Sequence, residues 1–433
     1  MLGPSEINYK DLESPFWTKY HTFLVWTLSI NRFFNLFMIV FTGLSIRQIA
    51  NAINVNSITM IIIFAIMNLG SGLALFLRYI ADIIGRKKTF IVMHIGLMMA
   101  YGISAMATNV LFFIISRLAV GIFSMNVSGL IITEEVPAKY RGRAIGLTEG
   151  IGMTSSILAS YLAVFLEINL DYWREIFWLM AIIGIIIQTI FAIFIKETRR
   201  YKYFLKNNNN RSFKQAFFGV FKRKYLKFMI LSISLFFCIN GVYQTIKRYY
   251  PAFLIEERGF LGFNTEIVGY WSIFLYISSI IGYSLCGFIS DHIGRKKTIS
   301  ISAASYFLGS LFVLVFYNMY IIFIGFIIIN FCFAIFINTA SVLTVEYFST
   351  EDRSIGSGWN STIINFLSIF GNFSIFLVAD PYLGLGLGWG NSFLLFGSIY
   401  IIGVIIIPQF FMETKSRVIE EIYIQDIERN IEI

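Results

Sequence analysis

Long runs of apolar residues, separated by short polar segments, follow one another along the whole chain. Each run holds about 20 mostly apolar residues, the length that a helix needs to cross a hydrocarbon slab of ~30 Å. Strands of a membrane barrel would be about 10 residues long and strictly alternating, unlike these runs. We therefore predict an all-α integral membrane protein with twelve spans, approximately 22–45, 57–78, 89–107, 110–133, 144–167, 174–195, 228–249, 267–289, 298–317, 319–345, 355–378 and 391–411.

The composition agrees with a bilayer as the solvent of this chain. Of its 433 residues, 57% are hydrophobic and 14% are charged, and the mean hydropathy is +0.73. An ordinary soluble core could not bury that much apolar surface. Lipid is therefore the expected partner of most of the surface.

The basic residues give an orientation. When Arg78, Arg174, Lys247 and Arg248 at the span edges are counted with the adjoining loops, 27 of the 34 Lys and Arg residues fall on the side that carries both termini and five on the other side. Arg32 and Arg117 lie deeper inside spans. Because positively charged loops stay in the cytoplasm, we expect a cell-membrane protein with both termini cytoplasmic. The net charge of +9 is then a topology signal, and no nucleic-acid partner is implied.

The chain divides near its middle. Residues 196–227 hold 11 basic residues and one acidic residue, and include a run of Asn that favours a loop. We predict that this basic cytoplasmic linker joins a first six-helix half, residues 1–195, to a second six-helix half with a short cytoplasmic tail, residues 228–433.

Three polar motifs occur once in each predicted half, in the same order and at nearly constant separation. "ADIIGRKKTF" at 81–90 matches "SDHIGRKKTI" at 290–299, "EEVPAKYRG" matches "VEYFSTEDR" with a Glu seven residues before an Arg, and "KETRR" matches "METKS". The acidic pairs are Asp82 and Asp291, 209 residues apart, Glu134 and Glu346, 212 apart, and Glu197 and Glu413, 216 apart. Such repetition is typical of two parallel six-span repeats with pseudo-symmetry.

The chemistry of these motifs suggests a gate at the cytoplasmic face. We expect each Asp to accept the free amides of the following helix, a Gly to form the tight turn, and the basic residues to bridge to the Glu side chains. If the charges only fixed topology, the matching acids would remain unexplained. The candidate gate residues are Asp82, Gly85, Arg86, Glu134, Arg141, Glu197, Arg200, Asp291, Gly294, Arg295, Glu346, Arg353 and Glu413.

These motifs resemble the major facilitator superfamily. "DIIGRKK" and "DHIGRKK" are similar to its signature G-x-x-x-D-x-x-G-R-[KR]-[KR], while "RLAVG", "YWRE", "EYFSTEDR" and "METKSRVIEEI" are similar to motifs of its sugar porter branch. The resemblance covers nearly the whole chain. It implies the major facilitator fold and a secondary transporter that works by alternating access, with its substrate site at mid-membrane between the halves.

The positions where that family binds substrate differ in this chain. Arg78 replaces a Gly of the first signature, although Gly287 retains it in the second. The family's sugar-binding Gln pair is replaced by Phe237 and Cys238, and its Gly-Pro and Trp by Asn338, Thr339 and Ser341. Asn35 and Met38 stand where related proton-coupled carriers have acids. Assignment of a hexose as the substrate would therefore rest on the fold alone, and a fold does not determine function.

Ionisable and polar groups inside the predicted spans are candidates for a substrate or proton path, because a charge at the centre of a membrane helix costs about 2.5–3.5 kcal/mol on insertion scales. The alternative for each is a structural hydrogen bond between helices. The candidates are Arg32, Asn35, Arg117, Asn126, Glu149, Tyr243, Gln244, Asn330 and Asn338.

Glu149 is the acidic residue that we place inside a span. It falls where the sugar porter pattern R-G-x-x-x-x-x-x-Q, counted from Arg141, has a substrate-binding Gln. Three roles stay open: Glu149 carries a coupling proton, it contacts the substrate, or it forms a silent pair with Arg32 or Arg117.

We expect a secondary active transporter of a small polar metabolite, a sugar or an organic acid, with protons as the coupling ion. A facilitative uniporter or a drug or metabolite exporter of the same superfamily are the alternatives, and a non-transporting sensor is disfavoured because the predicted loops reach only about 32 residues. The sequence suggests no enzyme, cofactor or metal site, since the His residues lie on separate segments and no phosphate-binding loop is present. We expect a monomer.

Overall fold

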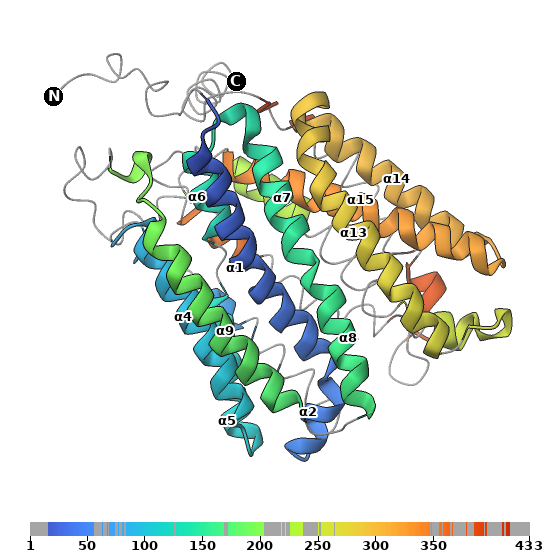
Figure 1. Cartoon of the computed structure of the whole chain (residues 1–433). Coiled ribbons are helices and arrows are strands. Elements are labelled where there is room, and N and C mark those ends of the chain that lie inside the picture. The colour runs from blue at the N-terminus through green and yellow to red at the C-terminus, as the bar shows by residue number, and fades with distance from the viewer. Residues whose placement is uncertain are drawn as a thin grey trace.

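The computed structural model describes residues 16–55, 84–124, 127–168, 172–202, 226–236, 253–263, 265–346, 358–363, 385–393 and 413–415, with the shorter stretches 63, 67, 69–73, 77, 80–81, 218, 221, 250, 348, 355–356, 366, 378, 395 and 409–410 (Figure 1). The elements are α1 (Lys19–Leu44), α2 (Ile46–Ala52), α4 (Arg86–Ala105), α5 (Val110–Phe123), α6 (Ser128–Glu135), η3 (Ala138–Tyr140), α7 (Arg141–Met153), α8 (Ser155–Ile168), α9 (Trp173–Phe194), η4 (Phe253–Glu257), η5 (Gly259–Leu261), α13 (Thr265–Ile293), α14 (Arg295–Val315) and α15 (Met319–Glu346). All of these elements are helical.

Seven helices of this part are long and apolar enough to cross a membrane. The helix α1, for example, has 26 residues, which at 1.5 Å per residue span about 39 Å. The predicted span 144–167 is divided by a turn at Thr154 into α7 and α8. Most of the predicted spans 57–78, 228–249, 355–378 and 391–411 lies outside the described residues.

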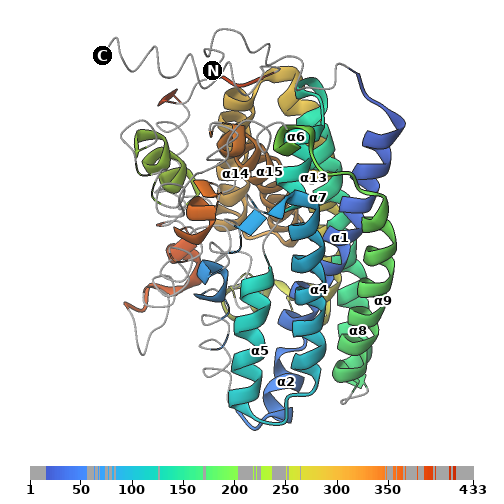
Figure 2. The same ribbon diagram turned by 90° about the vertical axis from the view of Figure 1, so that its left-hand side faces the viewer.

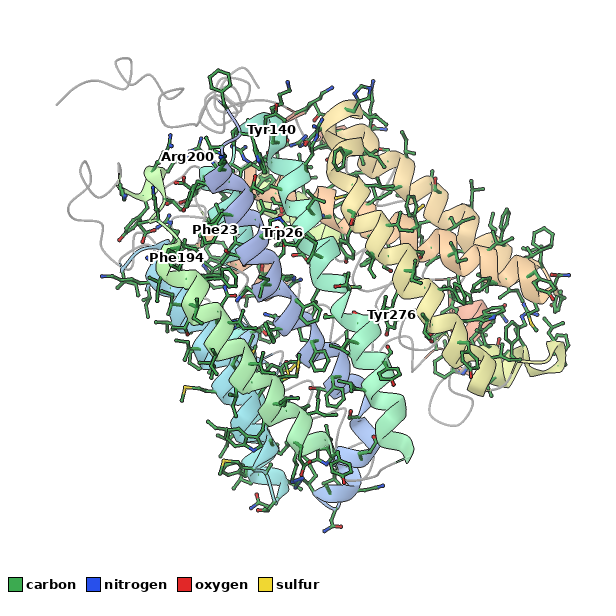
Figure 3. The ribbon with its side chains drawn as sticks, viewed as in Figure 1. Phe23, Trp26, Tyr140, Phe194, Arg200 and Tyr276 are labelled. Atoms are coloured by element: carbon green, nitrogen blue, oxygen red, sulfur yellow. The ribbon has the colours of Figure 1, made fainter. Side chains whose placement is uncertain are left out.

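The helix α7 lies between α1 and α13 and connects the predicted halves (Figure 1). On one side, α4 packs against α5 and α9 (Figure 2), and Phe23 of α1 meets Phe194 of α9 edge to face (Figure 3). On the other side, α15 packs against both α13 and α14. The start of α7 and the end of α13 lie at the same end of the molecule (Figure 1), so the two halves meet there.

The helix α9 shows how the sequence divides buried from lipid-facing positions. Its exposed apolar side chains recur every three to four residues, which places them on one face: Leu179, Ile182, Ile186, Ile190 and Ile193. Trp173, Phe177 and Ala181 recur every four residues on the buried face. In a membrane, such an apolar outer stripe faces lipid, while the inner stripe packs against α4 and α1.

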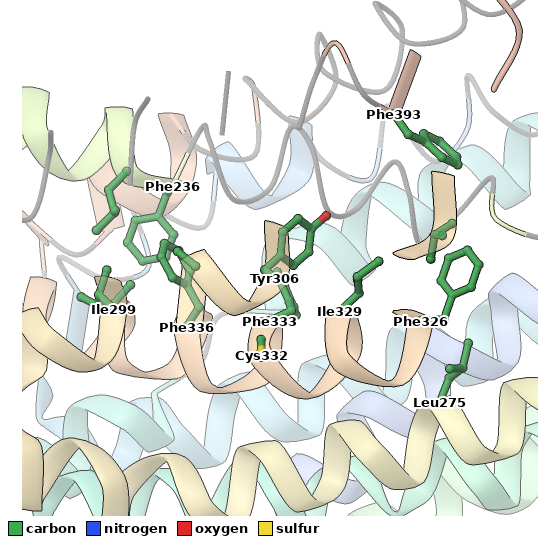
Figure 4. Packing of buried hydrophobic residues seen from close by; sticks show 14 of the residues in the cluster. Phe236, Leu275, Ile299, Tyr306, Phe326, Ile329, Cys332, Phe333, Phe336 and Phe393 are labelled. Carbon is green, nitrogen blue, oxygen red and sulfur yellow. The ribbon is translucent and has the colours of Figure 1, made fainter. Parts of the chain in front are cut away.

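Aromatic side chains fill the cores. In the second predicted half, Tyr306 of α14 packs among Ile329, Cys332, Phe333 and Phe336 of α15 (Figure 4). In the first half, the rings of Phe37, Phe41 and Phe177 are in contact between α1 and α9.

Candidate functional site

A buried charge cluster lies where the start of α4, the end of α6 and the segment after α9 meet. The guanidinium of Arg86 donates from Nε and Nη2 to Oε1 of Glu134, each at 3.2 Å. The hydroxyl of Thr198 donates to the other oxygen of Glu134 at 2.6 Å. Glu197 accepts the backbone N–H of Arg86 at 2.8 Å. We call Arg86, Glu134, Glu197 and Thr198 the first charge cluster.

The second half repeats this arrangement. Arg295 donates from Nη1 to Oδ1 of Asp291 at 2.7 Å, and its Nη2 lies 3.6 Å from Oε1 of Glu346. Thr414 donates to Oε2 of Glu346 at 2.6 Å, and Glu413 accepts the backbone N–H of Arg295 at 2.8 Å. These five residues are the second charge cluster. The contacts of Arg295, Glu346, Glu413 and Thr414 each have a counterpart in the first cluster, while Asp82, which matches Asp291 in sequence, lies outside the described residues.

The expectation that Asp291 caps the next helix is wrong. The free amides at the start of α14 are bound by Glu413, and those at the start of α4 by Glu197, from segments more than 100 residues away in sequence. The reason is the turn before each helix: Gly85 and Gly294 have φ of +105° and +109°, and a Cβ on either would lie within 3 Å of that Glu. Glycine leaves the amides open to a carboxylate from elsewhere.

Two interactions join the halves at this end. Arg141, at the start of α7, donates from Nη1 to Oε1 of Glu346, at the end of α15, at 3.2 Å, and both side chains are 1% exposed. The backbone N–H of Arg143 donates to Oδ2 of Asp291 at 3.2 Å, with its Nε 3.8 Å from the same oxygen. We call these the inter-half bridges. Breaking them would leave buried charges unpaired unless water enters.

Glycines let the backbones of α7 and α13 touch. Gly142, Gly146 and Gly150 recur every four residues along one face of α7. A Cβ on Gly146 would lie 2.8 Å from the carbonyl oxygen of Tyr283, and a Cβ on Gly287 would lie 2.3 Å from the carbonyl oxygen of Gly142. The glycine retained at 287 therefore has a steric reason. The α7–α13 seam is closed along its first turns.

Asn338 of α15 reaches the same seam. Its Nδ2 donates to Sγ of Cys286 at 2.8 Å, and that sulfur lies 3.0 Å from the place of a Cβ on Gly146. Asn330, two turns earlier on α15, donates to the carbonyl of Phe326 in its own helix at 2.9 Å. Of these two candidates, Asn338 lies closer to the path between the halves.

Arg32, and not Arg117, is the described cation that pairs with Glu149. Its Nε donates to Oε2 of Glu149 at 2.8 Å. Arg32 is the fourteenth of the 26 residues of α1, and Glu149 lies about 12 Å along α7 from Arg141. The side chains are 21% and 14% exposed, unlike the sealed inter-half bridges. The ion pair is therefore at mid-depth and accessible.

His94 is a polar residue that the sequence did not single out. Its Nε2 lies 3.1 Å from the carbonyl oxygen of Gly184, so this nitrogen carries the hydrogen, and its Nδ1 accepts from Nδ2 of Asn31 at 2.7 Å. Ser128 donates to the oxygen of the same amide at 3.4 Å. A small cavity lies beside these hydrogen-bonded side chains. It is lined by Asn31, Asn35, Phe90, Met93, His94, Leu97, Phe123 and Val127.

Arg117 lies in a different environment. Its guanidinium is fully buried on α5, 5.0 Å from the ring centroid of Tyr101, 4.8 Å from that of Phe113 and 5.8 Å from that of Phe177. Its nitrogens make no hydrogen bond within the described ranges. Its described contacts are therefore cation–π contacts within the first half.

The remaining candidates divide between one end of the molecule and the undescribed segments. Arg200 is buried at the end that also carries Tyr140, close to the start of α7 (Figure 3). Five candidates lie outside the described residues: Asp82, Asn126, Tyr243, Gln244 and Arg353.

Comparisons with known proteins identify the class. The sequence model of the Major Facilitator Superfamily matches residues 28–274 and 250–422, so the chain belongs to that superfamily. The predicted all-helical membrane fold and the class of transporter, rather than enzyme, are thereby confirmed.

The relatives carry different substrates in their names. The glucose transporter GlcP of Staphylococcus epidermidis is 25% identical over 400 residues, 79% of this chain and 83% of that protein. The cis,cis-muconate transport protein of Acinetobacter baylyi is 25% identical over 66% of this chain and 68% of that protein. A Bacillus subtilis protein named as a niacin/nicotinamide transporter, NiaP, is 23% identical, and the match spans 53% of this chain and 58% of that protein.

A solved structure of the proton:xylose symporter XylE has the same fold, with a TM-score of 0.75 at 15% identity, over 94% of this chain and 99% of that one. At this identity, the likeness concerns the fold and not the substrate.

Proposed function

We propose that this protein is a secondary active transporter that moves a small polar metabolite, a sugar or an organic acid, by alternating access and in symport with protons. The relatives named for glucose, niacin/nicotinamide and muconate support this substrate range. The observation that carries the proposal is the pair of inter-half bridges at one end of the molecule, with the accessible Arg32–Glu149 pair deeper along the same seam.

In this proposal the bridged end faces the cytoplasm, because it carries the basic "GRKK" motifs that positive-inside topology retains there. The described state is then closed toward the cytoplasm. Opening requires the α7–α13 seam to part and the bridges to break, while the first and second charge clusters stay within their own halves. The linker 196–227 would permit this motion.

Glu149 is the proposed proton carrier. Its ion pair with Arg32 supports a role in coupling over a contact that is only structural, since both side chains are partly accessible. The candidate path also includes Asn35 beside the cavity and Asn338 at the seam.

The test uses purified protein in liposomes with labelled glucose, niacin, nicotinamide and muconate, with and without an external acid gradient. We expect saturable uptake of at least one compound, and accumulation under the gradient that a protonophore abolishes. Uptake that does not depend on the pH gradient would favour a facilitative uniporter. Absence of uptake of every compound by folded protein would contradict the proposal.

A further inference from the structure

We propose that the transported substrate is a carboxylate anion, which takes the place of Glu149 on Arg32 while Glu149 accepts the co-transported proton. This inference rests on the proposed function and names its substrate class. In the exchange, the hydrogen bond from Arg32 to Glu149 breaks, a bond from Arg32 to the substrate carboxylate forms, and the proton adds to an oxygen of Glu149.

The geometry of Arg32 leaves room for a second carboxylate. Only Nε of its guanidinium bonds Glu149, and within the described ranges its two terminal nitrogens make no hydrogen bond. The guanidinium is a planar fork that binds a carboxylate through two parallel N–H groups. An incoming anion can therefore engage the terminal nitrogens before Glu149 leaves.

The position of the pair allows a substrate to reach it. Gly152 of α7 packs under the aliphatic part of Arg32, where a Cβ would lie 2.5 Å from Cγ of the arginine. The stem is therefore held, and the side chain as a whole is 21% exposed near the middle of α1. Gly150, the residue after Glu149 on α7, lies against Ser284 of α13, so the pair borders the seam that opens.

Charge balance then links the anion to the proton. Without substrate, Arg32 and Glu149 sum to zero. With substrate anion and proton, the guanidinium, the carboxylate and a neutral Glu149 again sum to zero. Binding of either one alone would leave a net charge in a low-dielectric site, which is costly. The site is therefore expected to carry one proton per monocarboxylate, electroneutrally, and to resist proton leak.

Among the described side chains, the neighbouring titratable groups do not supply an alternative charge. Tyr283 and Cys286 of α13 face the pair and are uncharged near neutral pH. On α4, His94 is one hydrogen bond from Asn31, the residue beside Arg32. The charged groups of the other packed elements with described side chains lie toward helix ends: Glu134 and Glu135 on α6, Arg141 and Arg143 on α7, Arg174 and Glu175 on α9, Asp291 on α13 and Glu346 on α15. The element α8 presents Tyr161, which is exposed.

A neutral sugar would gain little from this arrangement. It cannot replace Glu149 as the counter-charge of Arg32, so the ion pair would have to stay closed beside it or be broken at the cost of two unpaired charges. The pair thus discriminates by charge rather than by shape. A molecule that differs from a transported carboxylate only by carrying a neutral carboxamide in its place should be rejected.

The experiment uses the full-length protein and two matched probe pairs, nicotinate with nicotinamide and gluconate with glucose. Binding is measured as thermal stabilisation in detergent. Flux is measured in liposomes that contain a pH-sensitive dye, with the membrane potential clamped at two values. We expect binding and flux of at least one of the two anions, with one proton per anion and no effect of potential, and at least tenfold weaker signals for its neutral partner.

Four variants locate the effect. Arg32→Gln should lose anion binding and flux by at least tenfold. Glu149→Gln should keep exchange of labelled anion but lose proton movement and uphill accumulation. Arg174→Gln is the matched control, because this arginine donates to the carbonyl of Ala107 at the end of the helices opposite the charge clusters. This variant should change neither anion binding nor proton-coupled flux. In His94→Gln, proton coupling should persist.

The outcomes separate this inference from the proposed function. Flux of a neutral partner as fast as its anion, or anion flux that survives Arg32→Gln, overturns the carboxylate proposal while transport itself stands. Loss of proton coupling in His94→Gln but not in Glu149→Gln overturns the assignment of the proton. Anion binding that depends on Arg32 but is not accompanied by flux would contradict the proposed transport function and leave the carboxylate-binding role of Arg32 standing. Neither binding nor flux of any probe overturns both.

Discussion

Asp291 accepts two hydrogen bonds from opposite sides of the molecule: Arg295 of its own half holds Oδ1 at 2.7 Å, and the backbone N–H of Arg143 from the other half holds Oδ2 at 3.2 Å. One buried carboxylate thus belongs both to a cluster within a half and to a bridge between halves. Glu346 has the same double relationship, with Arg295 of its own half and with Arg141 of the other half. Changes at the bridges should therefore act on the equilibrium between conformations rather than on the substrate.

Asp291→Asn should open the bridged end. The substitution keeps the volume and removes a charge-assisted bond worth about 1.5 kcal/mol or more, so the open population should rise about tenfold. The readout is the alkylation rate of the buried thiol of Cys286, with the other two cysteines replaced by Ser. Glu257→Gln is the control, because Glu257 binds the amide of Gly390 elsewhere. An unchanged rate in Asp291→Asn would count against the gate.

Gly287→Ala should prevent closure of the α7–α13 seam. The added Cβ would lie 2.3 Å from a backbone carbonyl oxygen, which cannot move aside without separating the helices. We expect at least a tenfold loss of transport together with faster alkylation of Cys286. Gly129→Ala is the matched control, because a Cβ at that position would meet nothing within 4 Å. This variant should behave as the wild type. Full transport by Gly287→Ala would contradict the closed seam.

Glu413→Gln and Glu197→Gln should lower stability. Each acid accepts two successive backbone amides at a helix start, so loss of the charge should reduce the free energy of unfolding by about 1 kcal/mol. Thermal unfolding in detergent measures this effect. Glu175→Gln, at an exposed position in the first turn of α9, should lower the unfolding temperature less than either of these variants. Equal stability of all three variants would show that the caps do not matter.

His94 and Asn31 should be energetically coupled. Replacing either by Leu leaves the polar partner buried without its hydrogen bond, at a cost of about 1–3 kcal/mol, whereas replacing both removes the need for that bond. A double-mutant cycle on thermal stability should therefore give a coupling energy above about 0.5 kcal/mol. Additive effects would mean that the bond contributes nothing.

The orientation is tested with single cysteines at Asn208 in the basic linker and at Phe260, which is 70% exposed in η5, in a chain whose native cysteines are replaced. In intact cells, an impermeant thiol reagent should label the cysteine at 260 and reach the one at 208 only after permeabilisation. Labelling of position 208 from outside would reverse the topology.

The repeats made part of the site predictable from sequence. Identical motifs at a constant separation placed Arg86 and Arg295 at equivalent positions, and charge complementarity then suggested Glu134 and Glu346 as partners, which the structure brings together. The capping role assigned to Asp291 was wrong because the helix amides are reached by Glu413, whose proximity depends on tertiary packing.

Other features depend on the rotation of one helix against another, which sequence does not give. Whether Glu149 faced Arg32 or Arg117 could not be decided from sequence, because it does not give which helices flank α7. The structure packs α1 against α7 and α5 against α4. His94 was missed because it lies alone on an apolar helix and acquires its role through Asn31 and Gly184. The break at Thr154 follows Gly150 and Gly152 and precedes Ser155 and Ser156, a Gly/Ser signal that the prediction of one continuous span did not use.

The central claim is that the inter-half bridges part during each transport cycle. Arg141 and Glu346 are replaced together by Cys in a chain without its native cysteines, and a short bifunctional thiol reagent is used to join the halves. We predict that cross-linking stops uptake into liposomes, that reduction restores it, and that the same reagent leaves each single-cysteine variant active. Uptake by the cross-linked protein at the rate of its reduced form would contradict the account.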